Sequence, residues 1–90
     1  MKISKEKRDK ISEQTLFFLF TNHLKPFFTS EISRELARDE EFTKKLLLDL
    51  TKKKLLIKIT KNSSGLDYSR RLRWRLSDKA FKIYKEKLNT

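Results

Sequence analysis

The sequence predicts a mainly helical α+β domain with the element order helix, helix, helix, strand, strand, helix. Apolar residues recur at helical spacing in four separate segments. Between the last two of these, residues 57–59 and 72–76 alternate apolar with basic side chains, which is the period of a strand with one buried face. Residues 62–65, Asn-Ser-Ser-Gly, supply turn chemistry between the two strands. The length of 90 residues predicts one domain, 1–90.

The first helix is expected from about Ile3 to Phe20, because its apolar residues lie on adjoining helical stripes. Its first ten residues are mostly charged, so we expect residues 1–10 to form a projecting N-terminal extension of this helix. The phenylalanine-rich end of the helix, in contrast, is expected to enter the core.

The second helix follows a break in helical structure. Pro26 disfavours helical backbone at the residue before it, and Phe27-Phe28 are expected to be extended, which can supply a short extra strand. Ser30 is the expected N-cap of a two-turn helix of about Glu31 to Arg38, because a serine side chain accepts bonds from the N–H groups at a helix start. Glu31 lies in the first turn of this helix, where the helix dipole favours a negative charge.

Asp39 is the expected N-cap of a third helix of about Glu40 to Lys53. Because the connection between the second and third helices is short, the two helices must cross. The apolar residues of the third helix repeat at spacings of three and four, which predicts one buried face. The residues of that face are Phe42, Leu46, Leu47 and Leu50.

The two strands are expected at residues 55–60 and 71–76, joined as a hairpin. In the second strand the arginines should face one side and the intervening apolar residues the other. Trp74 is therefore expected to pack under the hairpin in the core. Ser77 is the expected N-cap of a final helix that continues to about Leu88.

The composition offers no set of residues suited to catalysis. The chain has no cysteine and one histidine, His23, which is interpreted as a surface residue. It lacks a glycine-rich phosphate loop and a carboxylate pair with a plausible pocket, so we predict no enzyme activity, no metal and no other cofactor. The longest apolar run has five residues and the N-terminus lacks a secretory signal. These features predict a cytoplasmic protein without contact to a membrane.

The positive charge is concentrated in one segment. The formal net charge of the chain is +11, and residues 52–75 carry nine basic residues against one acid, a local charge of +8. The remainder of the chain is nearly balanced. A near-neutral body with one basic projection is typical of proteins that bind a polyanion.

Residues 31–37, Glu-Ile-Ser-Arg-Glu-Leu-Ala, are followed by apolar residues at 42, 47, 50, 55 and 56. In this spacing the chain resembles the winged helix-turn-helix family, particularly the small prokaryotic regulators of the MarR and PadR kind. Residues 76–80, Leu-Ser-Asp-Lys-Ala, look like the strand-to-helix signature of that family, Leu-Thr, two polar residues and Gly. Asp67 and Arg70 resemble the Asp and Arg of a MarR-type wing, with two residues between them where that motif has one.

The resemblance implies a transcriptional regulator that binds double-stranded DNA, with the third helix in the major groove. The physical pattern agrees, because the stripe opposite the predicted buried face of this helix is mainly basic. A solvated helix face is the alternative. An apolar residue on this stripe, Leu48, fits either a thymine methyl group or a protein interface. The DNA-binding residues expected on the second and third helices are Ser30, Glu41, Lys44, Lys45, Leu48 and Lys52.

The basic hairpin is the second expected DNA contact, on the backbone or in the minor groove. Its arginines lie on one face of the second strand, and its tip is basic and polar. The alternative is a charged edge strand that is protected from aggregation. The expected DNA-binding residues of the hairpin are Lys61, Asn62, Ser63, Arg70, Arg71, Arg73 and Arg75.

The resemblance also implies a homodimer that pairs through its terminal helices. Apolar residues that exceed the needs of a small core are the candidates for this contact, although core packing can also absorb them. Two other functions stay open: a winged helix used as a protein-interaction module, and nonspecific coating of nucleic acid. The expected dimer-interface residues are Ile3, Ile11, Phe18, Ile83 and Leu88.

Overall fold

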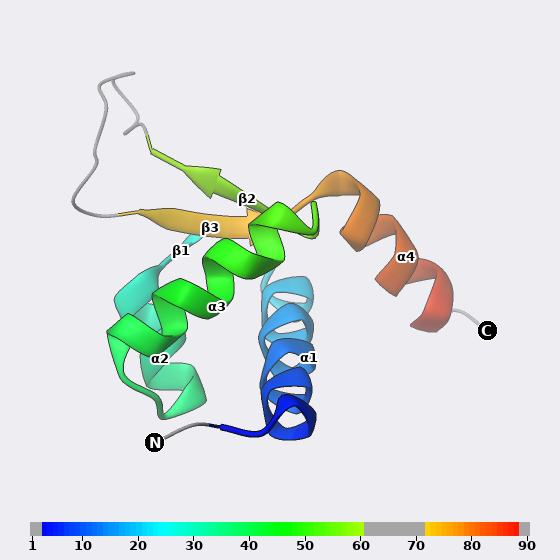
Figure 1. The fold of residues 1–90 in the computed structure, drawn as a ribbon. Coiled ribbons are helices and arrows are strands. Elements are labelled where there is room, and N and C mark those ends of the chain that lie inside the picture. The colour runs from blue at the N-terminus through cyan, green and yellow to red at the C-terminus, as the bar shows by residue number, and fades with distance from the viewer. Residues whose placement is uncertain (1–2, 61–71, 89–90) are drawn as a thin grey trace.

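The computed structural model describes residues 3–60 and 72–88, and over these it has the predicted α+β order, with the short extra strand included. Three helices lie below a small sheet, and the fourth helix follows the last strand and lies to the right of the other three (Figure 1). The elements are α1 (Lys5–Thr21), β1 (Phe27–Phe28), α2 (Thr29–Leu36), α3 (Glu40–Lys52), β2 (Leu56–Ile59), β3 (Arg73–Leu76) and α4 (Asp78–Leu88).

The three strands form one antiparallel sheet in the order β1-β3-β2. The central strand, β3, places Trp74 opposite Phe27 on one side and opposite Lys58 on the other. The predicted turn at residues 62–65 lies outside the described residues.

The core lies where α1, α2 and α3 meet the sheet. Trp74 is completely buried there, as predicted, and its indole Nε1 donates to Thr29 Oγ1 at 2.8 Å. The tryptophan thus connects β3 to the start of α2 as well as filling space. The other buried apolar residues are Ile11, Leu16, Leu19, Ile32, Leu36, Leu46, Leu47, Leu50, Leu56, Leu76 and Ala80.

Side chains close the starts of α3 and α4 as predicted. Asp39 accepts from the Phe42 N–H at 2.6 Å, and Ser77 accepts from the Ala80 N–H at 3.1 Å. These bonds satisfy N–H groups that have no partner within the helix. The Ser4 side chain does the same at the start of α1.

The predicted start of α2 is wrong by two residues. The helix begins at Thr29 with Phe28 as N-cap, and Ser30 lies in its first turn. Glu31, three residues beyond this cap, accepts from the Phe28 N–H at 2.9 Å, which is one half of a capping box. The hydrogen bond from Trp74 to the Thr29 side chain ties this start to the sheet, so a tertiary contact accompanies the earlier boundary.

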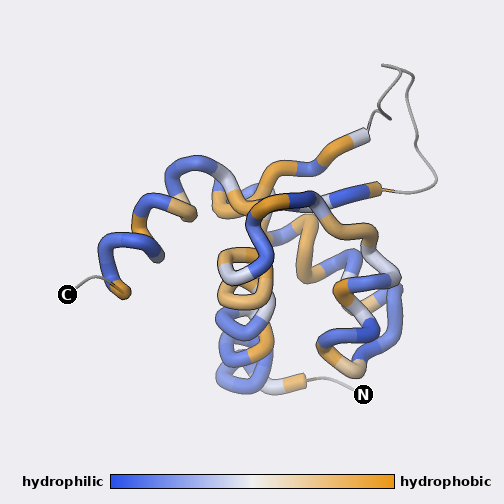
Figure 2. The backbone as a smooth tube through the Cα atoms, turned by 180° about the vertical axis from the view of Figure 1, so that it is seen from behind, coloured by the Kyte–Doolittle hydropathy of each residue, from blue (hydrophilic) through white to orange (hydrophobic). Residues whose placement is uncertain are grey.

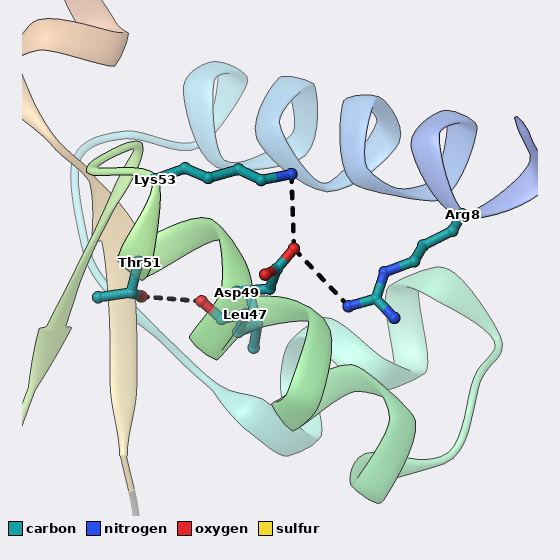
Figure 3. A network of polar contacts seen from close by, with 5 residues as sticks. All are labelled: Arg8, Leu47, Asp49, Thr51 and Lys53. Atoms are coloured by element: carbon teal, nitrogen blue, oxygen red, sulfur yellow. Dashed lines mark hydrogen bonds and ion pairs between the residues drawn. The ribbon is translucent and has the colours of Figure 1, made fainter. Parts of the chain in front are cut away.

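From Arg8 onward α1 contacts the body of the domain, so the expected projection of residues 1–10 does not extend as far as Arg8. Arg8 forms an ion pair with Asp49 of α3 (Figure 3). Ile11, one turn further on, is buried in the core. The early turns of α1 are mostly hydrophilic and its end mostly hydrophobic (Figure 2). The charged residues therefore line the solvent side of a packed helix.

Helix α4 is attached mainly through its first half. Ala80 is its buried residue, and the Phe81 ring packs against Phe20 and His23, with centroids 5.3 and 4.7 Å apart. Burial, together with the Glu13 carboxylate of α1, raises the pKa of Tyr84. In the second half of α4, the described side chains are mostly exposed to solvent.

Candidate nucleic-acid interface

Helices α2 and α3 form a helix-turn-helix whose turn depends on a left-handed residue. Ala37 has a φ of 54°. The N–H groups of Ala37 and Arg38 donate to carbonyl oxygens in the last turn of α2. Asp39 then starts α3 at once. The chain reverses within three residues, so α3 crosses α2 and turns one face to solvent.

The buried face of α3 comprises Leu46, Leu47, Leu50 and also Thr43, whose hydroxyl donates to the Asp39 carbonyl at 2.8 Å. Phe42, predicted on this face, is only partly buried. The orientation of the opposite face is as predicted. Its exposed charged residues are Glu41, Lys44, Lys45 and Lys52.

Two residues expected at this interface lie closer to the core than predicted. Leu48 is partly buried and packs against the core cluster, so it is not an isolated apolar residue on a charged surface. Ser30 is also partly buried, and its carbonyl accepts from the Ser33 hydroxyl at 2.9 Å. Helical spacing alone placed Leu48 outside, because it takes no account of the neighbouring elements that cover it.

Two of the acidic side chains at the start of α3 interact with groups of the same helix. Asp39 caps α3, and the Glu41 carboxylate lies 3.8 Å from Lys45 Nζ, one turn away. Both members of this ion pair are highly exposed, so its contribution to stability is small. Glu41 therefore offsets the charge of one of the three lysines on the exposed face.

The arginine face of β3 is less open than predicted. The Arg75 guanidinium donates to the Leu76 carbonyl at 3.0 Å and lies 3.5 Å from Asp78, while the Arg73 guanidinium lies 6.0 Å from the centre of the Phe28 ring. Both arginines are partly buried.

Strand register explains this burial. Ile57 lies opposite Arg75, and Ile59 lies opposite Arg73. Directly opposed residues share a face of a sheet, so the isoleucines lie with the arginines rather than with the tryptophan. The resulting surface is mixed, apolar and basic, instead of a row of bare guanidinium groups.

Part of the expected hairpin site lies outside the described residues. This holds for the expected DNA-binding residues Lys61, Asn62, Ser63, Arg70 and Arg71. Their place in the site stays a prediction.

Within residues 3–60 and 72–88 no three His, Asp or Glu side chains gather in a way that would hold a metal ion. The same residues contain no helix that is long and apolar enough to cross a membrane.

Of the expected dimer-interface residues, Ile83 and Leu88 are exposed on α4, whereas Ile11 is buried in the core of the protomer. Phe18 is also largely engaged, since its ring packs 5.0 Å from that of Phe27. The assignment of Ile11 is corrected, because a side chain buried inside one protomer cannot line a contact with another. Phe18 is only partly buried, so its assignment stays a prediction. The neighbouring Phe17, which sequence reasoning missed, is 50% exposed.

No family model and no curated protein sequence matches the chain. Solved structures do match it. A complex of Staphylococcus aureus MepR with DNA has a TM-score of 0.75 and 22% identity, over 93% of this chain and 66% of that one. MepR, a transcription regulator of the multidrug efflux pump MepA in S. aureus, gives a TM-score of 0.69 and 22% identity, over 88% and 54%. A Lactococcus lactis ZitR mutant in apo form gives 0.70 and 20%, over 93% and 58%.

The chain thus spans between about half and two thirds of the length of these structures. Of these neighbours MepR is named as a transcription regulator, and none of the three carries the name of an enzyme. The likeness extends over the helix-turn-helix and the sheet, since it covers nearly all of this chain. The chain therefore has the winged-helix fold.

Proposed function

We propose that the protein is a transcriptional regulator that binds double-stranded DNA with a preference for particular sequences. The observation that carries the proposal is the exposed face of α3, where Lys44, Lys45 and Lys52 lie opposite a well-packed apolar face. A helix that is firmly packed on one side and basic on the other suits the major groove. The structural likeness to a MepR–DNA complex supports the same use of the fold.

The lysines of α3 would contact phosphate oxygens or guanine edges, and the basic hairpin would follow the backbone or the minor groove. The charge of +8 over residues 52–75 supplies the nonspecific attraction. Base contacts from α3 then select among sequences. A site of action on DNA is consistent with the predicted cytoplasmic location.

The first test is a titration of random-sequence duplexes and duplexes from genomic upstream regions by fluorescence anisotropy at two salt concentrations. We expect tight binding to a subset of duplexes. If the protein neutralises 6 to 10 phosphates, affinity should fall about 10³- to 10⁵-fold between 50 and 200 mM salt.

Equal affinity for every duplex would instead indicate nonspecific nucleic-acid coating. A complete lack of binding at 50 mM salt would contradict the proposal. The protein-interaction alternative relied on an exposed Leu48 and on the acids Asp39 to Glu41. Leu48 is partly buried, Asp39 caps α3 and Glu41 pairs with Lys45, which weakens the basis of this alternative.

The proposed regulator acts as a homodimer that pairs through its terminal helices. Support comes from apolar side chains left exposed on these helices, namely Phe17 on α1 with Ile83 and Leu88 on α4. A symmetric dimer would place two copies of α3 about 34 to 36 Å apart, one turn of DNA, and would favour a pseudo-palindromic site.

Substituting Phe17→Glu together with Ile83→Glu is expected to convert the dimer to a monomer, because four carboxylates would face one another across the two-fold axis. Sedimentation equilibrium measures the mass directly. The matched control is Leu24→Glu, at an exposed leucine in the loop after α1. A dimer mass that survives the double substitution would remove this surface from the interface.

A further inference from the structure

One carboxylate on α3 is held by two basic residues from different parts of the chain. Asp49 Oδ2 lies 3.8 Å from Arg8 Nη2 of α1 and 3.5 Å from Lys53 Nζ. Figure 3 shows the two basic side chains reaching this carboxylate from opposite directions. The arginine contact crosses between two helices, whereas the lysine contact is local, from i to i+4.

Asp49 lies within reach of two lysines of the exposed face of α3. It lies four residues after Lys45 and three before Lys52, the spacings at which side chains meet on a helix surface. Helix α3 has three acids and three lysines within its bounds, so it carries no net charge. The cationic character of its exposed face therefore depends on where its acidic side chains point.

Stability does not explain this aspartate. The side chains of Arg8 and Asp49 are 40% and 41% exposed, and ion pairs at such positions contribute little to folding. The residue also lies in the last turn of α3, where the helix dipole disfavours an acid.

We propose that Arg8 is a positioning residue for DNA recognition. By engaging the Asp49 carboxylate on the side of α3 that faces α1, it keeps this carboxylate from pairing with Lys45 and Lys52. Lys52 then remains available to phosphate groups, and Lys45 keeps only its exposed pair with Glu41, 3.8 Å away. This inference rests on the proposed DNA-binding function and adds to it a residue outside the helix-turn-helix.

The test is a double-mutant cycle of Arg8→Ala and Asp49→Asn, read as affinity for the preferred duplex at 50 mM salt. Arg8→Ala should weaken binding about fivefold, because the Asp49 carboxylate, then held by Lys53 alone, competes more strongly with phosphate for the lysines of the exposed face. In the Asp49→Asn background the same substitution should change affinity less than about twofold. The double variant has the net charge of the wild type, so a change in total charge cannot produce this pattern.

Two controls separate positioning from folding and from simple loss of charge. Arg8→Lys keeps a cation of similar reach and should bind within about twofold of the wild type. Lys82→Ala removes one positive charge from the exposed surface of α4 and should have less effect than Arg8→Ala. Thermal unfolding should show that all variants fold, with midpoints that differ by only a few degrees.

An equal loss from Arg8→Ala in both backgrounds would overturn the inference, because it would indicate a direct contact between Arg8 and phosphate. The same loss from Arg8→Lys would also overturn it. If instead the wild type binds no duplex, the proposed function fails, and the inference fails with it. Binding by the wild type with an additive cycle removes the inference alone.

Discussion

Replacing Lys44, Lys45 and Lys52 together with alanine should weaken binding to the preferred duplex about a hundredfold. These three side chains are exposed on the face of α3 that lies opposite its buried leucines. Each lysine that contacts a phosphate or a guanine contributes on the order of 1 kcal/mol or more to the free energy of binding. The loss of all three therefore corresponds to about a hundredfold weaker affinity. The measurement is fluorescence anisotropy at 50 and 200 mM salt. The slope of log affinity against log salt should become shallower by nearly one for each phosphate that the variant no longer neutralises.

The matched control removes three lysines of α4, Lys79, Lys82 and Lys85, which are also exposed. This variant has the same net charge as the first, but the change lies on α4, outside the helix-turn-helix (Figure 1). It should lose only the general attraction to DNA, a much smaller factor. Equal losses in the two variants would mean that α3 does not face the DNA.

Trp74→Ala should have the largest effect on folding. The side chain is completely buried at the centre of the sheet, and its removal leaves a cavity beneath β3 and an unpaired Thr29 hydroxyl. Substitutions of this kind cost about 3 to 5 kcal/mol, which is a large part of the stability of a domain of this size. Urea denaturation followed by circular dichroism measures the loss.

Trp74→Phe is the informative control, since it keeps most of the apolar volume and loses the hydrogen bond to Thr29. Its cost should be clearly lower, about 1 to 2 kcal/mol. An alanine variant as stable as the wild type would show that the tryptophan does not hold the sheet to α2.

Local patterns account for the parts of the fold that were predicted correctly. The start of α3 depends on Asp39 and the next few residues, and its face depends on leucines at spacings of three and four. The start of α4 depends in the same way on Ser77. Capping and helical period act within one or two turns, so the sequence alone carries their signal.

The errors have a different origin, because they depend on contacts between distant segments. Five consecutive apolar residues end α1, at 16–20, and leave no unique buried face within that run. Packing against the rest of the domain buries Leu16 and Leu19, largely engages Phe18, and exposes Phe17. Helical period alone could not separate the last two.

The pairing register of β2 with β3 and the ion pair between distant residues also leave no local pattern in the sequence. Alternation along β2 was consistent with either face being buried, and only pairing with β3 places Ile57 beside Arg75. Arg8 and Asp49 lie on helices that are far apart in sequence. Neither residue stands out in the pattern of the chain, and their ion pair is seen only in the folded domain.

The position of β3 at the centre of the sheet has a consequence for the order of folding. Its pairing with β1 joins Phe28 to Arg73, two residues separated by the whole helix-turn-helix. Closing so long a loop is entropically costly, so this pairing should form after the helices between the strands have shortened the distance. Strand β1 is therefore joined to the sheet late, on a body that is already assembled. A nascent chain would accordingly hold its helices before it acquires the full three-stranded sheet.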